Sequence, residues 1–203
     1  MERKNLGVLV SGRGSNLQCI MDACAAGKIP ARVAVVISDH SDAYALERAR
    51  QAGIPALAVN MRDYPDKAGY ELYIVEVLQK HGVHLVCLAG YMRLVGPTLL
   101  GAFAGRIMNI HPALLPSFPG LHAQEQAWRY GVKYSGCTVH FVDDGMDTGP
   151  IIMQAVVPVY DDDTVDMLTE RILEQEHRIY PEAVKLYCED KLIVEGRRVR
   201  VRV

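Results

Sequence analysis

Two polar side chains at the end of an apolar run are the sharpest chemical signal in the sequence. Asn109 and His111 stand two residues apart where the run 107–110 ends, and this run predicts a β-strand. Side chains two apart on a strand point to the same face. An amide and an imidazole held side by side can stabilise a developing oxyanion while the imidazole moves a proton. A lone histidine at a strand end is more often structural. Here Asn109, His111 and the rigid Pro-rich loop 112–120 all lie at the carboxyl end of a sheet strand, which favours a catalytic interpretation.

A second polar cluster lies in residues 135–150. Thr138 and His140 share one face of the predicted strand 136–142. The loop after this strand carries three acids, Asp143, Asp144 and Asp147. They lack the ligand spacing and the terminal glutamate of a calcium loop, so we expect no metal there and a solvated acidic turn at 143–144. One carboxylate of this loop placed near His111 would raise the pKa of the imidazole and favour its charged form.

The turn after the first predicted strand suits an anion. Gly12 and Gly14 let the backbone approach a ligand closely, and the helix that follows offers free N–H groups and a partial positive end. Ser15 and Asn16 can add side-chain donors or cap that helix. The third glycine of a dinucleotide-binding motif would fall at Leu17, and no P-loop lysine is present, so a monophosphate fits best. A capped turn without a ligand is the alternative.

These groups are positioned by an alternation of strands and helices in the first 90 residues. The pattern predicts strands at 6–10, 33–37, 56–59 and 83–89, and helices at 16–26, 44–52 and 67–80. Near-continuous apolar strands separated by helices indicate an α/β fold: a single-domain, mostly parallel twisted sheet of Rossmann-like type with helices on both faces. Ligands bind such sheets beyond the carboxyl ends of the strands, where the turn and the first polar cluster lie.

The second half of the chain is less regular. It predicts strands at 107–110, 136–142 and 151–159, and helices at 122–130 and 164–187. Pro181 should kink or split the last helix. The residues 192–203 carry four arginines, and we interpret them as an edge strand whose charges deter pairing with other chains. The expected organisation is one domain, 1–203, with a phosphate-binding half at about 1–90, a second half at about 91–187 that carries the polar clusters, and a tail at 188–203.

Composition narrows the class of protein. The chain has 203 residues with 22 basic and 24 acidic side chains, so no basic excess points to nucleic acid or to a membrane surface. No apolar run approaches the ~20 residues that cross a bilayer, and no signal-peptide pattern opens the chain. The five cysteines form no C-x-x-C pair, which argues against structural zinc and against a disulfide framework. We therefore expect a cytoplasmic protein that binds small molecules.

Three blocks in the second half together resemble the folate-dependent formyltransferase family. They are 109–116 (NIHPALLP), 136–140 (GCTVH) and 147–150 (DTGP), and the resemblance extends from residue 6 to about 187. It implies the family's fold and a catalytic trio of Asn109, His111 and Asp147. His140 and Thr138 are expected to support the catalytic pocket. The resemblance also implies 10-formyltetrahydrofolate as co-substrate and no metal, and it makes the half at about 91–187 the folate-binding and catalytic one.

The turn 10–18 resembles that of the family member that formylates glycinamide ribonucleotide in purine biosynthesis. The resemblance therefore implies that Gly14, Ser15 and Asn16 bind the ribose phosphate. Glu176 matches a helix acid near the substrate amine, and a surface glutamate is the alternative interpretation.

Segment 91–95 matches the segment whose backbone holds the pterin ring in this family. The resemblance assigns folate contacts to Met92, Arg93, Leu94 and Val95, together with Asn109. Without a ligand, this segment would be ordinary core with one solvated arginine. Lys67 stands where the family has a folate-contacting arginine, and a lysine keeps the charge but loses the fork geometry.

The reaction that the resemblance implies is direct formyl transfer. The substrate amine attacks the formyl carbon, and the carbonyl oxygen becomes an oxyanion. The imidazolium of His111 and the amide of Asn109 would stabilise that charge. Asp147 would hold His111 protonated and relay a proton through water.

Three alternatives stay open. A methionyl-tRNA formyltransferase and a formyltetrahydrofolate hydrolase share the catalytic blocks, but the first should carry a nucleic-acid-binding domain and the second an N-terminal regulatory domain. The short tail leaves no room for either, so we expect the two small-molecule substrates as partners, with no nucleic acid and no membrane. A non-catalytic phosphate-binding module would need only the turn. A homodimer stays open as the assembly state.

Overall fold

The computed structural model describes residues 3–202, and the contacts divide the chain into two compact units, Met1–Met108 and Asn109–Val203. The α/β class is confirmed, because strands and helices alternate along most of the chain. The division falls later than the expected one near residue 90. Segment 91–95 therefore belongs to the first unit, together with the turn at 11–16.

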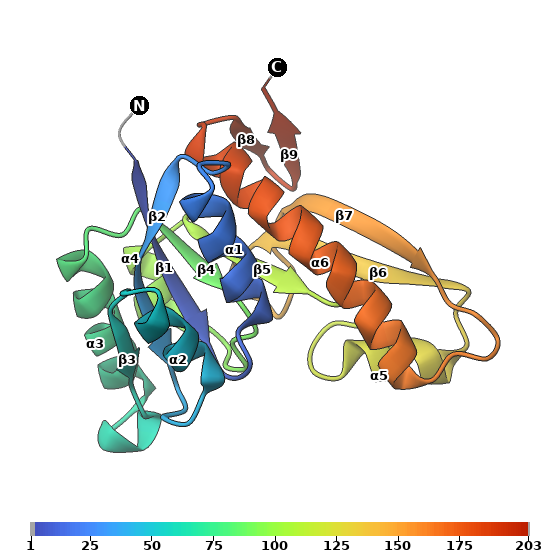
Figure 1. Cartoon of the computed structure of the whole chain (residues 1–203), viewed down its shortest axis with the longest axis horizontal. Coiled ribbons are helices and arrows are strands. Elements are labelled where there is room, and N and C mark those ends of the chain that lie inside the picture. Colours follow the sequence, from blue (N-terminus) through green and yellow to red (C-terminus); the bar gives the residue numbers. More distant parts are fainter. Residues whose placement is uncertain (1–2, 203) are drawn as a thin grey trace. The chain divides into compact units, whose positions relative to one another are not determined.

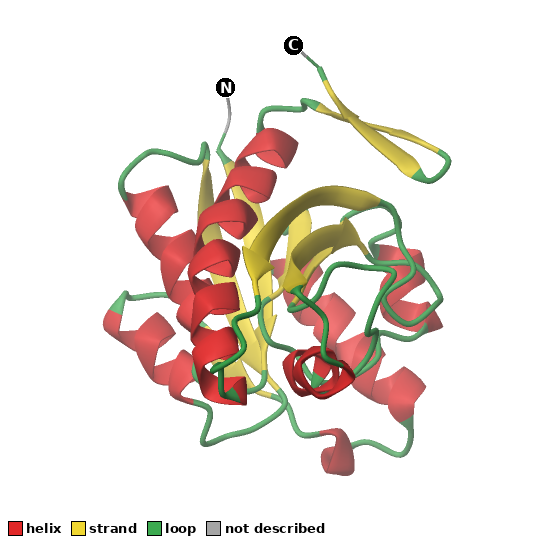
Figure 2. Ribbon diagram, turned by 90° about the vertical axis from the view of Figure 1, so that its right-hand side faces the viewer, coloured by secondary structure: helices red, strands yellow, loops and turns green. Residues whose placement is uncertain are grey.

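The first unit is a parallel sheet with helices on both faces (Figures 1 and 2). Its strands are β1 (Lys4–Val10), β2 (Ala31–Ser38), β3 (Ala56–Ala58) and β4 (Leu85–Leu88), in the order β3-β2-β1-β4. Helices α1 (Ser15–Ala25) and α2 (Tyr44–Gln51) contact each other and β2, whereas α3 (Lys67–Lys80) contacts α4 (Pro97–Ala102). A short 3-10 helix, η1 (Met61–Asp63), precedes α3. All four residues of β4 are buried, as expected for a strand covered on both faces.

Helix α4 was not predicted, because its six residues are too few to show a helical period. It begins with Pro97, a position where a missing N–H costs no hydrogen bond. The buried carboxylate of Glu71 accepts hydrogen bonds from the N–H groups of Gly96 and Leu99 and so takes the place of a local cap. A side chain from another helix thus makes this short helix possible.

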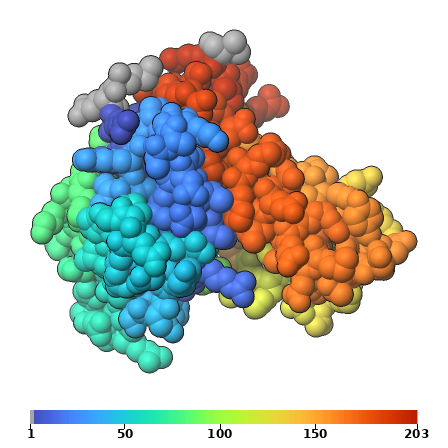
Figure 3. Space-filling model, in the orientation of Figure 1, coloured from blue at the N-terminus to red at the C-terminus, as the bar shows by residue number. Residues whose placement is uncertain are grey.

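The second unit is built on a mixed sheet with one long helix across it (Figure 1). Strand β5 (Ile107–His111) spans the boundary between the units, and the order of the later strands is β6-β7-β9-β8. These strands are β6 (Tyr134–Phe141), β7 (Ile151–Pro158), β8 (Leu192–Glu195) and β9 (Arg198–Val201). The pair β6/β7 is antiparallel, β7/β9 is parallel and β8/β9 is antiparallel. Helix α6 (Val165–Cys188) contacts β6, β7 and α5 (Ala123–Tyr130), and its outer side forms an orange-to-red band in Figure 3.

Helix α6 runs through Pro181 as one helix of 24 residues, so the prediction of a possible split is corrected. Proline removes one backbone hydrogen bond from a helix interior, but packing on either side can hold the helix together. Ile179, Tyr180, Ala183 and Val184 are all buried around this position. Their burial keeps the last turns in place.

The predicted C-terminal edge strand is two strands. Gly196 turns the chain at a φ of 60°, and β8 and β9 pair antiparallel around it as the twisted ribbon at the C-terminal end of Figure 2. The interpretation of 192–203 as one strand missed that Gly196-Arg197, with glycine at the first position, can form a two-residue hairpin turn. β8 lies at the edge, and β9 pairs with β7 through Ile151 and Arg198.

A buried ion pair secures the start of α6. Thr164 caps the helix by accepting a hydrogen bond from the N–H of Met167, and the buried Asp163 pairs with both nitrogens of the Arg171 guanidinium at 2.6 and 2.7 Å. The indole N–H of Trp128 donates to the Asp163 carbonyl at 2.6 Å and so connects α5 to this turn. No helix within residues 3–202 is both long and apolar enough to cross a lipid bilayer.

Candidate active site

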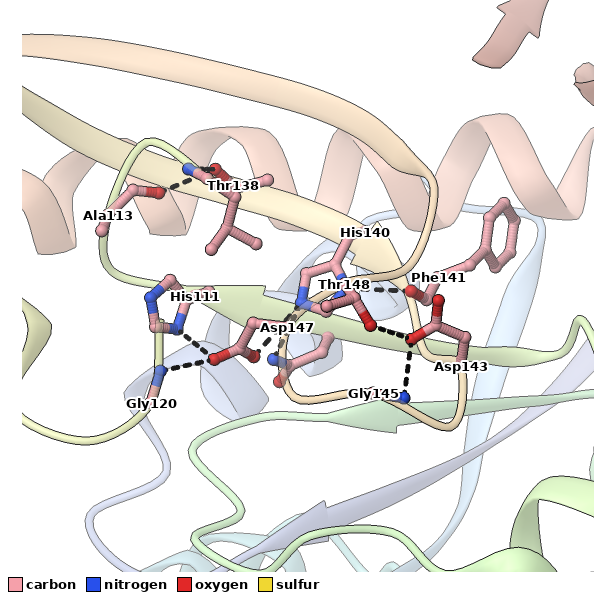
Figure 4. Close-up of polar contacts among 12 residues, drawn as sticks. His111, Ala113, Gly120, Thr138, His140, Phe141, Asp143, Gly145, Asp147 and Thr148 are labelled. Carbon is pink, nitrogen blue, oxygen red and sulfur yellow. Dashed lines mark hydrogen bonds and ion pairs between the residues drawn. The ribbon is translucent and has the colours of Figure 1, made fainter. Parts of the chain in front are cut away.

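The residues of the predicted catalytic trio lie in the second unit, where His111, His140 and Asp147 come together (Figure 4) and His140 also contacts Asn109. The end of β5 presents Asn109 and His111, the neighbouring strand β6 presents His140, and the loop between β6 and β7 presents Asp147. His111 is 4% exposed, so its ring is almost fully removed from water. The four side chains form one set of contacts.

The His111 ring has an oxygen atom facing each nitrogen. Nδ1 lies 3.4 Å from Oδ2 of Asp147, and Nε2 lies 2.8 Å from the carbonyl oxygen of Phe118. The same Asp147 oxygen accepts a hydrogen bond from the N–H of Gly120 at 2.8 Å (Figure 4). The Pro-rich loop therefore holds both the imidazole and its carboxylate partner.

The charge state of His111 differs from the expectation. Burial lowers the pKa of His111 and outweighs the Asp147 carboxylate and the Phe118 carbonyl, both of which raise it. The prediction that a nearby carboxylate would leave the imidazole with a raised pKa is therefore wrong in its net direction. The sequence places the carboxylate correctly but cannot weigh it against the loss of solvent.

Asp147 sits in an uncommon backbone conformation. Its φ is 55°, in the left-handed region that aspartate tolerates better than most residues. Burial alone would raise the pKa of Asp147, but contacts with His140, the Gly120 N–H and His111 lower it overall. Asp147 is thus held as a carboxylate between two imidazoles.

The loop that carries Asp147 is closed by its own side chains. Asp143 accepts hydrogen bonds from the N–H of Gly145 at 3.2 Å and from the hydroxyl of Thr148 at 2.6 Å (Figure 4). Gly149 packs so closely on the Phe141 carbonyl that no side chain would fit. Asp144 is exposed as expected, but the interpretation of Asp143 as a merely solvated acid is corrected, because it shapes the loop.

His140 orients the amide of Asn109. Its Nδ1 lies 2.8 Å from the Phe141 carbonyl, which can only accept, so this nitrogen carries a proton. Nε2 lies 3.2 Å from Nδ2 of Asn109 and, in the neutral ring, accepts from it. Oδ1 of Asp147 is 3.7 Å from the same nitrogen, beyond hydrogen-bonding distance, and acts through its charge. His140 therefore sets which way the Asn109 amide points.

Thr138 supports the Pro-rich loop, and its hydroxyl bonds to that loop and to Gln154. Its hydroxyl donates to the Ala113 carbonyl at 2.7 Å and accepts from the Leu115 N–H at 3.1 Å. Gln154, opposite Thr138 on β7, donates to the same hydroxyl and to the Leu115 carbonyl. Sequence reasoning missed Gln154, because only the register of β6 and β7 brings it there.

The glycine-rich turn lies in the first unit and borders a cavity of about 230 Å³. Gly14 precedes α1, and no side chain caps the helix, so the interpretation of Ser15 or Asn16 as a cap is corrected. The lining residues are Ser11, Gly12, Arg13, Gly14, Ser15, Asn16, Ala89, Gly90 and Met92. Uncapped first-turn N–H groups facing a hollow of this size suit a phosphate.

Helix α2 holds this turn in shape. Gly14 has a φ of 73°, and a Cβ there would lie 2.6 Å from the Cβ of Ala45. The Ala45 N–H donates to the Gly12 carbonyl at 3.0 Å, and the Arg48 guanidinium donates to the Arg13 carbonyl at 2.8 Å. Sequence reasoning missed Ala45 and Arg48, which have no motif of their own. Arg13 is also among the residues that line the cavity.

The predicted folate segment is anchored to the same turn. The Met92 N–H donates to the Ser11 hydroxyl at 2.9 Å, and the Arg93 guanidinium donates to the buried Asp39 at 2.7 Å. Burial opposes ionisation of Asp39, but contacts with Ser11, His40 and Arg93 lower its pKa overall. Arg93 is thus paired, which corrects the alternative of a solvated arginine.

The apolar side chains of the segment remain open to a ligand. Met92 and Leu94 are 60% and 59% exposed, whereas Val95 is half-buried. Lys67, the first residue of α3, has its Nζ 3.9 Å from Oε1 of Glu71, which also holds Gly96. Lys67 is therefore brought beside the end of the segment, as its proposed folate contact requires.

Glu176 is buried, so its interpretation as a surface glutamate is wrong. It lies near Cys137, and burial together with this carboxylate raises the pKa of the Cys137 thiol to about 12. Cys137 alternates with Thr138 and His140 along β6 and faces the opposite side. The role of Glu176 at a substrate amine stays a prediction. Within residues 3–202, no three His, Cys, Asp or Glu side chains are grouped to hold a metal ion.

Comparison with known proteins agrees with this architecture. The Formyl transferase family model matches residues 4–184. The chain is 46% identical over 182 residues to the phosphoribosylglycinamide formyltransferase of Bacillus subtilis, covering 90% of this chain and 93% of that protein. It is 47% identical over 186 residues to the trifunctional purine biosynthetic protein adenosine-3 of Drosophila melanogaster. That match covers 91% of this chain but only 14% of the fly protein.

A solved structure extends the likeness over the whole chain. The glycinamide ribonucleotide transformylase 1 of Symbiobacterium toebii has a TM-score of 0.98 and 58% identity, covering 100% of this chain and 95% of that one. The family match includes the turn, segment 91–95 and the three catalytic blocks. The geometry of these parts and the match across both units lead to one conclusion: this chain belongs to the formyl transferase family.

Proposed function

We propose that this chain transfers the formyl group of 10-formyltetrahydrofolate to the amine of glycinamide ribonucleotide, in purine biosynthesis. The products would be formylglycinamide ribonucleotide and tetrahydrofolate. The observation that carries the proposal is the joining of Asn109, His111 and Asp147 in one contact network. The names of the B. subtilis and S. toebii relatives support the same reaction.

In the proposed reaction, Asn109 and His111 stabilise the oxygen that gains charge when the amine attacks the formyl carbon. The bond from the substrate nitrogen to that carbon forms, and the bond from the carbon to the folate nitrogen then breaks. His140 contributes by holding the Asn109 amide with Nδ2 in a fixed direction. Donors positioned in advance are worth the most in a water-poor site, because they need no rearrangement as charge develops.

The proton balance of His111 follows from its burial. Because burial lowers its pKa, the neutral ring is favoured in the free enzyme. An oxyanion forming beside the ring raises the pKa again, since negative charge favours the imidazolium. Asp147 stabilises that charged form at 3.4 Å and can pass the amine proton toward the leaving nitrogen through water. His111 thus gains charge by taking up the proton that the amine loses, and returns to neutral when that proton passes on to the leaving nitrogen.

Phosphate and folate contacts are assigned to the first unit, and the contact with the substrate amine to Glu176 of the second. The N–H groups of Gly14, Ser15 and Asn16 would hold the ribose phosphate, with Arg13 supplying positive charge. The exposed Met92 and Leu94 would flank the pterin, and the backbone of 92–95 would bond to it. Lys67 would meet the charged folate tail, and Glu176 the substrate amine. The cytoplasmic location and a homodimer stay predictions.

One assay separates the candidate functions. Release of the folate product is followed by absorbance, with and without glycinamide ribonucleotide. Folate product formed only when the ribonucleotide is present supports transfer. No folate product under any condition supports a binding module. Product without the ribonucleotide supports hydrolysis and would overturn the proposal.

A further inference from the structure

The C-terminal hairpin touches the loop that carries Asp147. The Arg197 guanidinium, in the turn between β8 and β9, donates a hydrogen bond to the Thr148 carbonyl at 2.9 Å. One residue later, Arg198 pairs with Ile151 at the start of β7. Two successive hairpin residues therefore contact the segment 148–151, directly after Asp147. The family model ends at residue 184 and assigns nothing to this hairpin.

The loop is held at several points. Asp147 itself is contacted by the Gly120 N–H, His111 and His140, and Asp143 closes the loop through Gly145 and Thr148. Arg197 adds a contact at the Thr148 carbonyl, directly after Asp147. Residues 144–146 and 148 are exposed, while Asp147 keeps a left-handed conformation. Such a conformation persists when its surroundings determine it. Arg197 fixes the peptide group after Thr148, which limits how far the loop can turn Asp147 away from His111.

We propose that Arg197 is a positioning residue: it holds the loop so that Asp147 stays in contact with His111. The inference rests on the proposed function, because it takes Asp147 to be catalytic. Arg197 would not touch either substrate. Its loss should therefore lower kcat and leave the KM of both substrates unchanged.

The other arginines of the hairpin do not share this contact. Arg200 pairs with Glu195 across the hairpin at 3.1 Å, and Arg202 donates its backbone N–H to the Lys191 carbonyl. A general effect of positive charge would involve these residues equally. Arg198 meets Ile151 by strand pairing, so among the described arginines of the hairpin the geometry assigns the side-chain contact with the loop to Arg197, and Arg200 is the matched control.

The experiment compares Arg197→Ala, Arg197→Lys and Arg200→Ala in the full chain. For Arg197→Ala we expect kcat to fall on the order of 3- to 10-fold, the size of one ordinary solvent-exposed hydrogen bond. The limb of the kcat–pH profile that reports His111 should move to lower pH, because a more distant Asp147 raises its pKa less. Arg197→Lys should recover part of kcat, and Arg200→Ala should match the parent chain.

Hydrogen exchange provides a readout that does not depend on activity. Peptides covering 143–149 should exchange faster in Arg197→Ala than in Arg200→Ala, with equal melting temperatures. If Arg197→Ala does not fold, Arg197→Lys and Arg197→Gln carry the same comparison.

Equal exchange in the Arg197 and Arg200 variants, or faster exchange with an unchanged kcat, would overturn the inference. Asp147→Asn separates this failure from failure of the proposed function. Parent-like turnover in Asp147→Asn would remove the catalytic assignment itself, whereas a slow Asp147→Asn beside a normal Arg197→Ala would remove only the positioning role.

Discussion

At the turn around Gly14, backbone groups and small residues shape the pocket, whereas at the His111 cluster three titratable side chains share one network. In the first unit the decisive contacts are steric and main-chain: Gly14 against Ala45, and the Gly12 carbonyl with the Ala45 N–H. In the second unit the decisive contacts are between titratable groups: the Asp147 carboxylate lies 3.4 Å from the His111 imidazole and 3.7 Å from that of His140. A pocket of the first kind should respond to side-chain size, and a cluster of the second kind to pH.

Removing a side chain from the His111 cluster should give the largest fall in kcat. Asn109→Ala and His111→Ala should each lower kcat by about 10²–10³-fold, because the proposed mechanism uses each side chain to stabilise the developing oxyanion. The KM for glycinamide ribonucleotide should hardly change. Steady-state kinetics with both substrates measures this, and the melting temperature controls for folding. Parent-like turnover in both variants would contradict the assignment.

Removing only a charge from this site tests its proton chemistry. Asp147→Asn keeps a residue that tolerates the left-handed conformation, so the loop should hold its shape. We expect kcat to fall on the order of 10²-fold, the lower end of acid–base contributions. Since the Asp147 carboxylate raises the pKa of His111, the His111 limb of the kcat–pH profile should move to lower pH. A limb that moves to higher pH would exclude this coupling.

Adding one methyl group tests the steric site. Gly14→Ala forces a Cβ against Ala45 and a side chain into positive φ, which should cost ~1–3 kcal/mol of stability. We expect the KM for glycinamide ribonucleotide to rise about tenfold, since 1.4 kcal/mol of binding is a factor of ten, with kcat nearly unchanged and no pH shift. Gly12→Ala is the control, because a Cβ there meets no described atom within 4 Å. Equal effects of the two substitutions would show that packing against α2 is unimportant.

The smallest effect on catalysis is expected at the Arg93–Asp39 ion pair, which lies outside the His111 cluster and beside the glycine-rich turn. Arg93→Met leaves the buried Asp39 without its guanidinium and should raise the folate KM a few-fold and cost ~1–3 kcal/mol of stability. The pKa of Asp39 is lower in the folded state than in the unfolded chain. Its ionised carboxylate therefore stabilises the fold at pH values above the pKa of the unfolded chain, and this stabilisation is lost as the pH falls through the folded-state pKa. The stability difference from the parent chain should therefore shrink in acid. Denaturant unfolding at several pH values measures it, with the exposed Arg62→Met as control.

Sequence patterns predicted the parts that depend on local order. The strands and helices of the first unit lie close to their expected ranges, because apolar runs, glycine stops and capping residues act over a few residues. Asn109 and His111 share a site because strand alternation is a local rule. The same reasoning could not predict α4, whose cap is the distant Glu71, or the pairing of β9 with β7.

The electrostatic details were the hardest to predict. Spacing indicated a carboxylate near His111, but its pKa depends on how deeply the ring is buried, which only the packed structure defines. For the same reason Arg93 and Glu176 each had a surface interpretation, and both are held in the fold. The position of a long polar side chain depends on the group it bonds to, and that group often belongs to a distant part of the sequence, as Asp39 does for Arg93.

The contact of Trp128 with the Asp163 carbonyl has an optical consequence. Trp128 is the single tryptophan of the sequence, and it lies in the second unit. Its fluorescence therefore reports when α5 leaves the turn before α6, while far-UV circular dichroism reports the helices of both units. Coincident transitions by the two signals would mark cooperative unfolding of the whole chain, and separate transitions would resolve the units without any label.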